Sequence, residues 1–161
     1  MTDQPKNKFQ QVGRVKVIKG SILFPHDAGL RIILNIANTA GKMESPLYAV
    51  FEKKWPKAKQ EVRGSFATKT GAYKLGTIAA NTALQSDVWC VSVLCQDDNL
   101  NTDVVALEKS LKEVCKLAKY EKASLHISTL LTEAIPELQD LITTNLVEQG
   151  VAVCYYEEPT V

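Results

Sequence analysis

Six short runs of apolar, mostly β-branched residues are spread along this chain, and they constrain its fold more than any other feature. We predict strands over Val12–Ile18, Arg31–Ala37, Leu75–Ala80, Val88–Leu94, Ala123–Ile127 and Val151–Tyr156. Several of these runs are apolar almost throughout and do not alternate, as is typical of strands whose sheet is covered by helices on both faces. The pattern therefore excludes an open β sandwich.

Segments with the periodicity of helices lie between these runs. The clearest one follows the capping candidates Thr102 and Asp103, and its apolar residues recur every three or four positions. We predict helices over Thr102–Lys119, Glu137–Glu148 and Pro46–Trp55. Gly150 and Pro56 are the stop signals after the last two of these. Strands that alternate with helices in this way are typical of an α/β sandwich.

The size and charge of the chain exclude several classes of protein. Its 161 residues suit one domain, which we expect over residues 11–161 behind a polar leader of residues 1–10. A net charge of +1 is too small for charge-driven nucleic-acid binding. No stretch reaches the roughly 18 apolar residues of a membrane span, and the leader has no apolar core, so we expect no membrane insertion and a cytoplasmic location.

The cysteines and histidines show no spacing that is typical of a metal site. The four cysteines are Cys90, Cys95, Cys115 and Cys154. They form no Cys-x-x-Cys pair, and the only histidines, His26 and His126, lie far apart in the sequence. We therefore predict core cysteines, no metal and no cofactor, and we expect His126 to be an interior histidine with satisfied hydrogen bonds.

Residues 35–56, which read NIANTAGKMESPLYAVFEKKWP, resemble the first conserved loop and helix of macro domains, the ADP-ribose-binding family. The positions that match the family pattern are Asn35, Asn38, Gly41, Met43, Phe51, Lys53, Trp55 and Pro56. They are most similar to the branch of ADP-ribosyl glycohydrolases that act on DNA or acidic side chains. The preceding KGSILF resembles a strand end whose Asp meets adenine in the family, and Ser21 stands in its place.

The resemblance extends from about residue 12 to residue 158. KLGTI, VWCVSVL, ASLHIS and GVAVCYYEEP resemble later strands of the family in the same order. This implies a macro-domain-like three-layer α/β sandwich, in which a mixed six-stranded sheet lies between helices. The periodicity of the sequence independently predicts the same class of fold.

The two loops that surround the diphosphate in macro domains differ here from the family pattern. Glu44 and Pro46 stand at glycine positions of the first loop, and Leu131 and Glu133 do so in the second, which reads STLLTEAIPEL. Glycines let backbone N–H groups approach phosphate oxygens, whereas proline removes a donor and carboxylates repel the anion. We therefore expect weak ADP-ribose binding, with a partial gain when all four residues are changed to glycine.

The catalytic lysine of the glycohydrolases is replaced by Gln96 in this alignment. An amide can neither form a Schiff base nor supply a positive charge. The acidic candidates Glu133 and Glu137 match the family only loosely, and we interpret Asp97 and Asp98 as residues of a helix entry. We therefore assign no catalytic residue.

The resemblance implies a set of ligand-contacting residues in the two loops. They are Asn35, Asn38, Gly41, Lys42, Met43, Ser128, Thr129 and Thr132. An alternative for Asn35 and Asn38 is that their side chains tie the turn after the strand. For Lys42, Lys53 and Lys54 the alternative is a solvated helix face.

Three functions agree with these observations. The first is a non-catalytic macro-domain-like protein that binds ADP-ribose or a related nucleotide weakly, or that serves as an interaction module for a protein partner. The second is an active ADP-ribosyl glycohydrolase that removes ADP-ribose from DNA or protein, against which Gln96 argues. The third is a structural or partner-binding accessory protein, for instance a viral one. The fold alone does not separate them, because function depends on the site.

Overall fold

The computed structural model describes residues 13–67 and 74–159, so the predicted leader, residues 1–10, lies outside the described residues. The strands are β1 (Val15–Lys19), β2 (Arg31–Asn38), β3 (Ile78–Gln85), β4 (Val88–Gln96), β5 (Ser124–Ser128) and β6 (Val153–Glu157). Each of the six predicted runs contributes one of them, and together they form a single mixed sheet. The predicted fold class is confirmed.

The strand order in the sheet is β1-β6-β5-β2-β4-β3. The first five strands in this order run parallel to one another, and β3 pairs antiparallel with β4. All five parallel strands therefore end at one edge of the sheet, which we call the carboxyl edge. They begin at the opposite one, which we call the amino edge.

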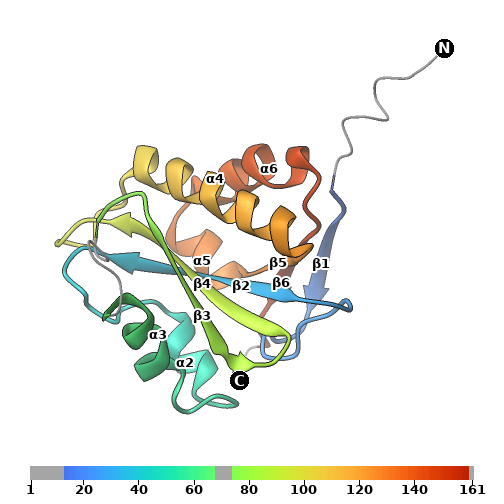
Figure 1. The fold of residues 1–161 in the computed structure, drawn as a ribbon, viewed down its shortest axis with the longest axis horizontal. Helices are drawn as coiled ribbons and strands as arrows, with labels where there is room; N and C mark the ends of the chain where they lie inside the picture. Colours follow the sequence, from blue (N-terminus) through green and yellow to red (C-terminus); the bar gives the residue numbers. More distant parts are fainter. Residues whose placement is uncertain (1–12, 68–73, 160–161) are drawn as a thin grey trace.

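Helices cover both faces of this sheet (Figure 1). They are α2 (Leu47–Phe51), α3 (Ala58–Ala67), α4 (Val104–Glu121), α5 (Thr129–Ala134) and α6 (Leu138–Asn145), with a 3₁₀ turn η1 (Val147–Gln149). The pair α4 and α6 lies on one face and the pair α2 and α3 on the other. This arrangement explains why several of the strands are apolar almost throughout.

The predicted start and stop signals of the helices are largely confirmed. The Asp103 side chain caps α4 by accepting a hydrogen bond from the Ala106 N–H at 2.9 Å. Gly150 ends η1 with a φ of 96°, a conformation that glycine adopts without steric cost. The predicted helix over Glu137–Glu148 is divided into α6 and η1, and α2 ends at Phe51 instead of reaching Trp55.

Two helices and part of one strand were missed. The segment of α3 is polar and contains Gly64, which hides its helical pattern, and the sequence predicts a ligand loop where the structure has α5. We predicted Leu75–Ala80 for the strand that the structure places at Ile78–Gln85. The start differs because Gly76 turns the chain with a φ of 88°, and the end differs because an edge strand such as β3 carries polar residues.

The core lies between the sheet and both helix layers, and all four cysteines are buried free thiols, as predicted. Trp55 is buried and Trp89 packs against the core, which agrees with the expectation for both. No helix within residues 13–67 and 74–159 is long and apolar enough to cross a bilayer.

Candidate functional site

The carboxyl edge brings together most of the residues that the resemblance assigned to ligand binding. Asn38, Gln96 and Ser128 are the last residues of β2, β4 and β5, which are neighbours in the sheet. Ligands of open α/β sheets bind in crevices outside the carboxyl ends of the strands. The predicted site residues therefore lie where a ligand of this class of fold is expected.

The first loop is closed by the side chain of Asn38. Its amide nitrogen donates to the Lys42 carbonyl at 2.7 Å, and its amide oxygen accepts from the Lys42 N–H at 2.9 Å. Gly41 makes the turn between them with a φ of 70°. The structure thus gives Asn38 the turn-tying role that the sequence left open, and its side chain is 2% exposed.

Asn35 lies deeper in the sheet and is fully buried. Its amide nitrogen donates to the Tyr48 hydroxyl at 3.1 Å and to the Ser92 hydroxyl at 3.0 Å, so it connects β2 with α2 and β4. The Asn35 amide oxygen has no hydrogen-bond partner among the residues that the structure describes. Asn35 therefore supports the strand from inside and does not face the surface of the carboxyl edge.

The first loop also packs against the end of β4. The Thr39 N–H donates to the Gln96 carbonyl at 3.0 Å, and the Thr39 hydroxyl contacts the Asp98 carboxylate. The Lys42 ammonium reaches the Asp98 carbonyl at 3.4 Å, while Met43 packs against the core. These contacts place an amide, Gln96, at the position where the resemblance expects a catalytic lysine.

Asp97 has a structural role in the turn after β4. Its carboxylate accepts from the N–H groups of Asn99 at 2.9 Å and Asn101 at 3.0 Å. Such a carboxylate is committed to the backbone, which agrees with the expectation that these adjacent acids are not a general acid and base pair.

The second predicted loop is a helix, and this corrects the alignment of its glycine positions. The Ser128 hydroxyl caps α5 by accepting from the Leu130 N–H at 3.1 Å, and Thr129 and Thr132 donate to carbonyls of Tyr156 and Thr129. Leu131 is fully buried in the core, whereas the second glycine position, Glu133, is exposed. Leu131 therefore does not face a ligand.

A pocket of about 570 Å³ lies at the carboxyl edge, beside the ends of β1, β5 and β6. Its lining residues are Ser21, Leu23, Phe24, Val50, Lys53, Lys54, Leu130, Glu158 and Pro159. We call it the carboxyl-edge pocket. Ser21, which the resemblance aligns with an adenine-contacting Asp, is part of this lining, but none of the eight predicted ligand residues is part of its described lining.

Two charged groups in the carboxyl-edge pocket have defined partners. The Lys54 ammonium donates to the Leu23 carbonyl at 2.6 Å and lies 4.6 Å from the Phe24 ring centroid. Desolvation, together with the charge of Arg31, lowers the pKa of Lys54, so the expectation of a solvated lysine is wrong for this residue. The Glu158 carboxylate accepts from the Ile22 N–H at 2.7 Å.

The sequence reasoning missed the walls of this pocket for a simple reason. The family pattern of the ligand loops consists of glycines and polar side chains, whereas five of the residues that line this pocket are apolar. Phe24 was within the quoted KGSILF, and its 66% exposure is unusual for an aromatic side chain. Only the fold brings Phe24 into one pocket with Leu130 and Pro159, which come from distant parts of the chain.

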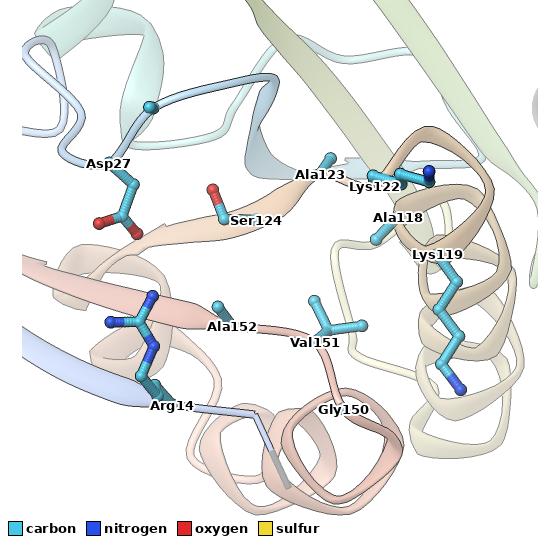
Figure 2. Close-up of a pocket in the computed structure, with 11 residues that line it drawn as sticks. Arg14, Asp27, Ala118, Lys119, Lys122, Ala123, Ser124, Gly150, Val151 and Ala152 are labelled. Atoms are coloured by element: carbon cyan, nitrogen blue, oxygen red, sulfur yellow. The ribbon is translucent and has the colours of Figure 1, made fainter. Parts of the chain in front are cut away.

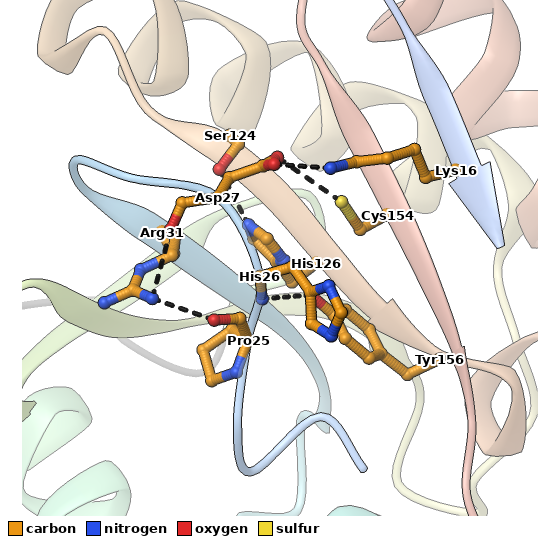
Figure 3. Close-up of polar contacts among 9 residues, drawn as sticks. All are labelled: Lys16, Pro25, His26, Asp27, Arg31, Ser124, His126, Cys154 and Tyr156. Carbon is orange, nitrogen blue, oxygen red and sulfur yellow. Dashed lines mark hydrogen bonds and ion pairs between the residues drawn. The ribbon is translucent and has the colours of Figure 1, made fainter. Parts of the chain in front are cut away.

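A second polar cluster lies toward the amino edge, where Lys16, Cys154 and His126 pair across β1, β6 and β5, and Figure 3 shows its side chains. His126 is fully buried, with its Nε2 2.7 Å from the Ser124 hydroxyl and its Nδ1 2.7 Å from the Tyr156 hydroxyl. This confirms the prediction of a satisfied interior histidine. Burial lowers the pKa of His126 to about 4, so that its imidazole is neutral at pH 7.

Asp27 completes this cluster from the loop before β2. Its carboxylate pairs with the Lys16 ammonium at 2.5 Å and accepts from the Cys154 thiol at 3.6 Å. The hydrogen bond from Lys16 lowers the pKa of Asp27, and burial raises the pKa of Cys154. The cluster thus combines a carboxylate, a neutral imidazole and a protonated thiol.

Several solved structures resemble this chain, and macrodomains are among them. A protein from Bacteroides thetaiotaomicron has a TM-score of 0.75 at 20% identity, with 89% of this chain and 99% of that one covered. A macrodomain protein from Streptomyces coelicolor has a TM-score of 0.75 at 18% identity, covering 91% and 100%. The macrodomain of Thermus aquaticus DarG has a TM-score of 0.61 at 18% identity, covering 90% and 99%.

Comparisons at the level of sequence add no relative to these structures. Neither the sequence models of known families nor the curated protein sequences match this chain. At identities of 18–20% the likeness to the solved structures concerns the fold. This chain therefore has the macrodomain fold, as its resemblance to that family implied.

Proposed function

We propose that this protein binds ADP-ribose or a related adenine nucleotide in the carboxyl-edge pocket, weakly and without hydrolysing it. The observation that carries the proposal is the pocket itself, which joins apolar walls to an exposed aromatic ring at the position implied for adenine. Its volume of about 570 Å³ falls within the range of small-molecule sites, roughly 300–1,000 Å³. The macrodomain fold of the solved relatives supports the same ligand class.

The walls of the pocket suit a planar base. Phe24 is 66% exposed and lines the same pocket as the apolar residues Leu130 and Pro159. Stacking of a base on an aromatic side chain contributes about 1–3 kcal/mol. We therefore assign the base to the space between Phe24 and the opposite apolar wall, with its polar edge toward Ser21 and Ile22.

A competing carboxylate explains why we expect weak binding. The Ile22 N–H is the backbone donor next to Ser21, and the Glu158 carboxylate already occupies it. A base nitrogen would have to displace this charge-assisted hydrogen bond, which is stronger than a neutral one. Glu158 also adds a negative charge to a pocket that has to accept phosphate groups, which Lys53 and Lys54 offset in part.

The absence of hydrolysis follows from the end of β4. The side-chain amide of Gln96 is uncharged and does not act as a general acid or base, and Asp97 holds the following turn through two backbone N–H groups. The charged groups near the first loop already have partners, since the Lys42 ammonium reaches the Asp98 carbonyl and the Asp98 carboxylate contacts the Thr39 hydroxyl. At the position of Gln96 itself, no base or cation is present to activate water for a bound ADP-ribosyl group. We therefore assign the protein a binding role.

Calorimetric titration with ADP-ribose, AMP and adenosine tests this proposal. We expect binding of all three, a loss of about tenfold for Phe24→Ala from the lost stacking, and a gain for Glu158→Gln. Tyr120→Ala removes an aromatic side chain that is 84% exposed on α4, outside the pocket, and is the matched control. If none of the three ligands binds to the wild type or to Glu158→Gln, the proposal is wrong and the interaction-module function gains support.

A further inference from the structure

We propose that Asp27, His126 and Cys154 form a site for a zinc-like divalent metal ion at the amino edge of the sheet. About one hundred residues of sequence separate Asp27 from His126, so no local sequence motif predicts this site. This site is distinct from the carboxyl-edge pocket, and the inference does not depend on the proposed function.

The strand register places two of the ligands side by side. His126 pairs directly with Cys154 across β5 and β6, and Cys154 pairs with Lys16 across β6 and β1. Residues directly opposite each other in neighbouring strands project to the same face of a sheet. The imidazole, the thiol and the Lys16 ammonium therefore share one face near the strand starts.

The third ligand comes from the loop that crosses this face. Asp27 has a φ of 73°, a left-handed conformation that asparagine and aspartate tolerate better than most residues. The loop is held in place because the His26 N–H donates to the Tyr156 hydroxyl at 2.8 Å. As Figure 3 shows, the Asp27 carboxylate consequently reaches the ends of both Lys16 and Cys154.

The distances suit a metal ion after a small adjustment of side chains. One ligand atom from each of the three residues lies within 4.8 Å of the others. Zinc bonds of about 2.0–2.3 Å in a tetrahedral site would separate the ligand atoms by roughly 3.3–3.8 Å. The Cys154 sulfur is already 3.6 Å from the Asp27 carboxylate, so the closing movement falls mainly on the imidazole.

The hydrogen bonds of His126 identify the nitrogen that would bind the metal. Its Nε2 contacts the hydroxyl of Ser124, which lines a pocket of about 590 Å³ together with Asp27 (Figure 2). Its Nδ1, on the other side of the ring, is hydrogen-bonded to the Tyr156 hydroxyl. When the metal replaces the Ser124 hydroxyl at Nε2, the Nδ1–H group still donates to Tyr156. A hydrogen bond of this kind from the second ring nitrogen is typical of metal-binding histidines.

The thiolate and the carboxylate match the charge of the metal ion, and the Lys16 ammonium is left as an excess positive charge. The ion takes the place of the Cys154 thiol proton between sulfur and carboxylate, and that proton passes to solvent as the sulfur–metal bond forms. One thiolate, one carboxylate and one neutral imidazole then compensate a divalent cation, and sulfur and nitrogen ligands favour zinc over magnesium or calcium. The pocket beside Asp27 and Ser124 leaves room for a water molecule as the fourth ligand, and its lining also includes the cationic residues Arg14, Lys119 and Lys122, which oppose a metal ion.

Lys16 is the natural competitor of the metal. Its ammonium holds one carboxylate oxygen of Asp27, while the Cys154 thiol contacts the other, so the metal can use the second oxygen without breaking the ion pair. The Lys16 side chain is 39% exposed and still repels a cation at this distance. Its removal is therefore expected to strengthen metal binding.

Titration with Co²⁺, which reports tetrahedral thiolate ligation by a charge-transfer band in the near ultraviolet, tests the site. We expect the wild type to show this band at one ion per chain, with displacement by Zn²⁺ and release of a proton. Cys154→Ser should abolish the band, and Cys115→Ser should keep it because Cys115 lies on α4, away from the cluster. Lys16→Met should tighten Co²⁺ binding by on the order of tenfold.

The outcomes are decisive in both directions. Absence of the band from the wild type and from Lys16→Met overturns the proposal, and so does a band that persists in Cys154→Ser. Circular dichroism of each variant shows whether it is folded. If Cys154→Ser is not folded, the tenfold effect of Lys16→Met decides, since a metal bound elsewhere would not respond to that residue.

Discussion

The structure and the alignment predict opposite results for the replacement of Leu131 by glycine. The alignment treats Leu131 as a residue that displaced a ligand-contacting glycine, whereas the structure buries its side chain completely beneath α5. Truncation of a buried leucine to alanine costs about 2.7–5.0 kcal/mol through lost burial and a cavity. A glycine inside a helix costs roughly 1 kcal/mol more than alanine.

We therefore expect Leu131→Gly to lower the free energy of unfolding by about 4–6 kcal/mol, a large part of the stability of a domain of this size. Glu133→Gly is the matched variant, because it lies in the same helix at an exposed position and should cost only about 1 kcal/mol. Urea denaturation measures both. A cost below about 1.5 kcal/mol for Leu131→Gly, accompanied by tighter ADP-ribose binding, would show that the residue faces a ligand after all.

Three further predictions concern stability. Folding lowers the pKa of His126 from 6.5 to about 4, so the unfolded chain binds an extra proton between these values and the free energy of unfolding falls as the pH drops from 6.5 to 4, by up to about 3 kcal/mol. Urea melts over this pH range with a chelator present measure the slope, which should flatten in His126→Gln. Asp103→Ala removes the cap of α4 and should cost about 1 kcal/mol, whereas Asp103→Ser should retain most of it, as thermal denaturation would show. Asn38→Ala removes both hydrogen bonds to Lys42 and should cost about 1–3 kcal/mol, and an unchanged midpoint of unfolding would contradict the turn-tying role.

The sequence alone was sufficient for the class of fold. The apolar β-branched runs and the helical periodicity between them predict the elements, because burial on both faces requires continuous apolar strands. Asp103 and Gly150 marked helix ends correctly, since capping and left-handed turns depend on local chemistry. The edge strand β3 was predicted least well, because an edge needs fewer apolar residues and its polar half resembled a loop.

The candidate site was predictable only in part. The resemblance placed Asn38 and Gln96 at one edge of the sheet, and the register confirms that they are neighbours. The turn-tying role of Asn38 was one of two alternatives that the sequence left open, whereas the helix α5 was not predicted in place of the second loop. The walls of the carboxyl-edge pocket come from four segments that lie far apart in the sequence, so no local pattern indicates that they meet.

What the sequence by itself determined is therefore local: which segments are strands or helices, where several of them end, and that the chain forms an α/β sandwich. Tertiary structure decided which side chains meet. Asp27, His126 and Cys154 are far apart in the sequence, and only the parallel pairing of β5 with β6 and the loop over them bring the three together. The physical reason is that secondary structure depends on neighbours within a few residues, whereas a site depends on strand order and register, which the packing of the whole sheet determines.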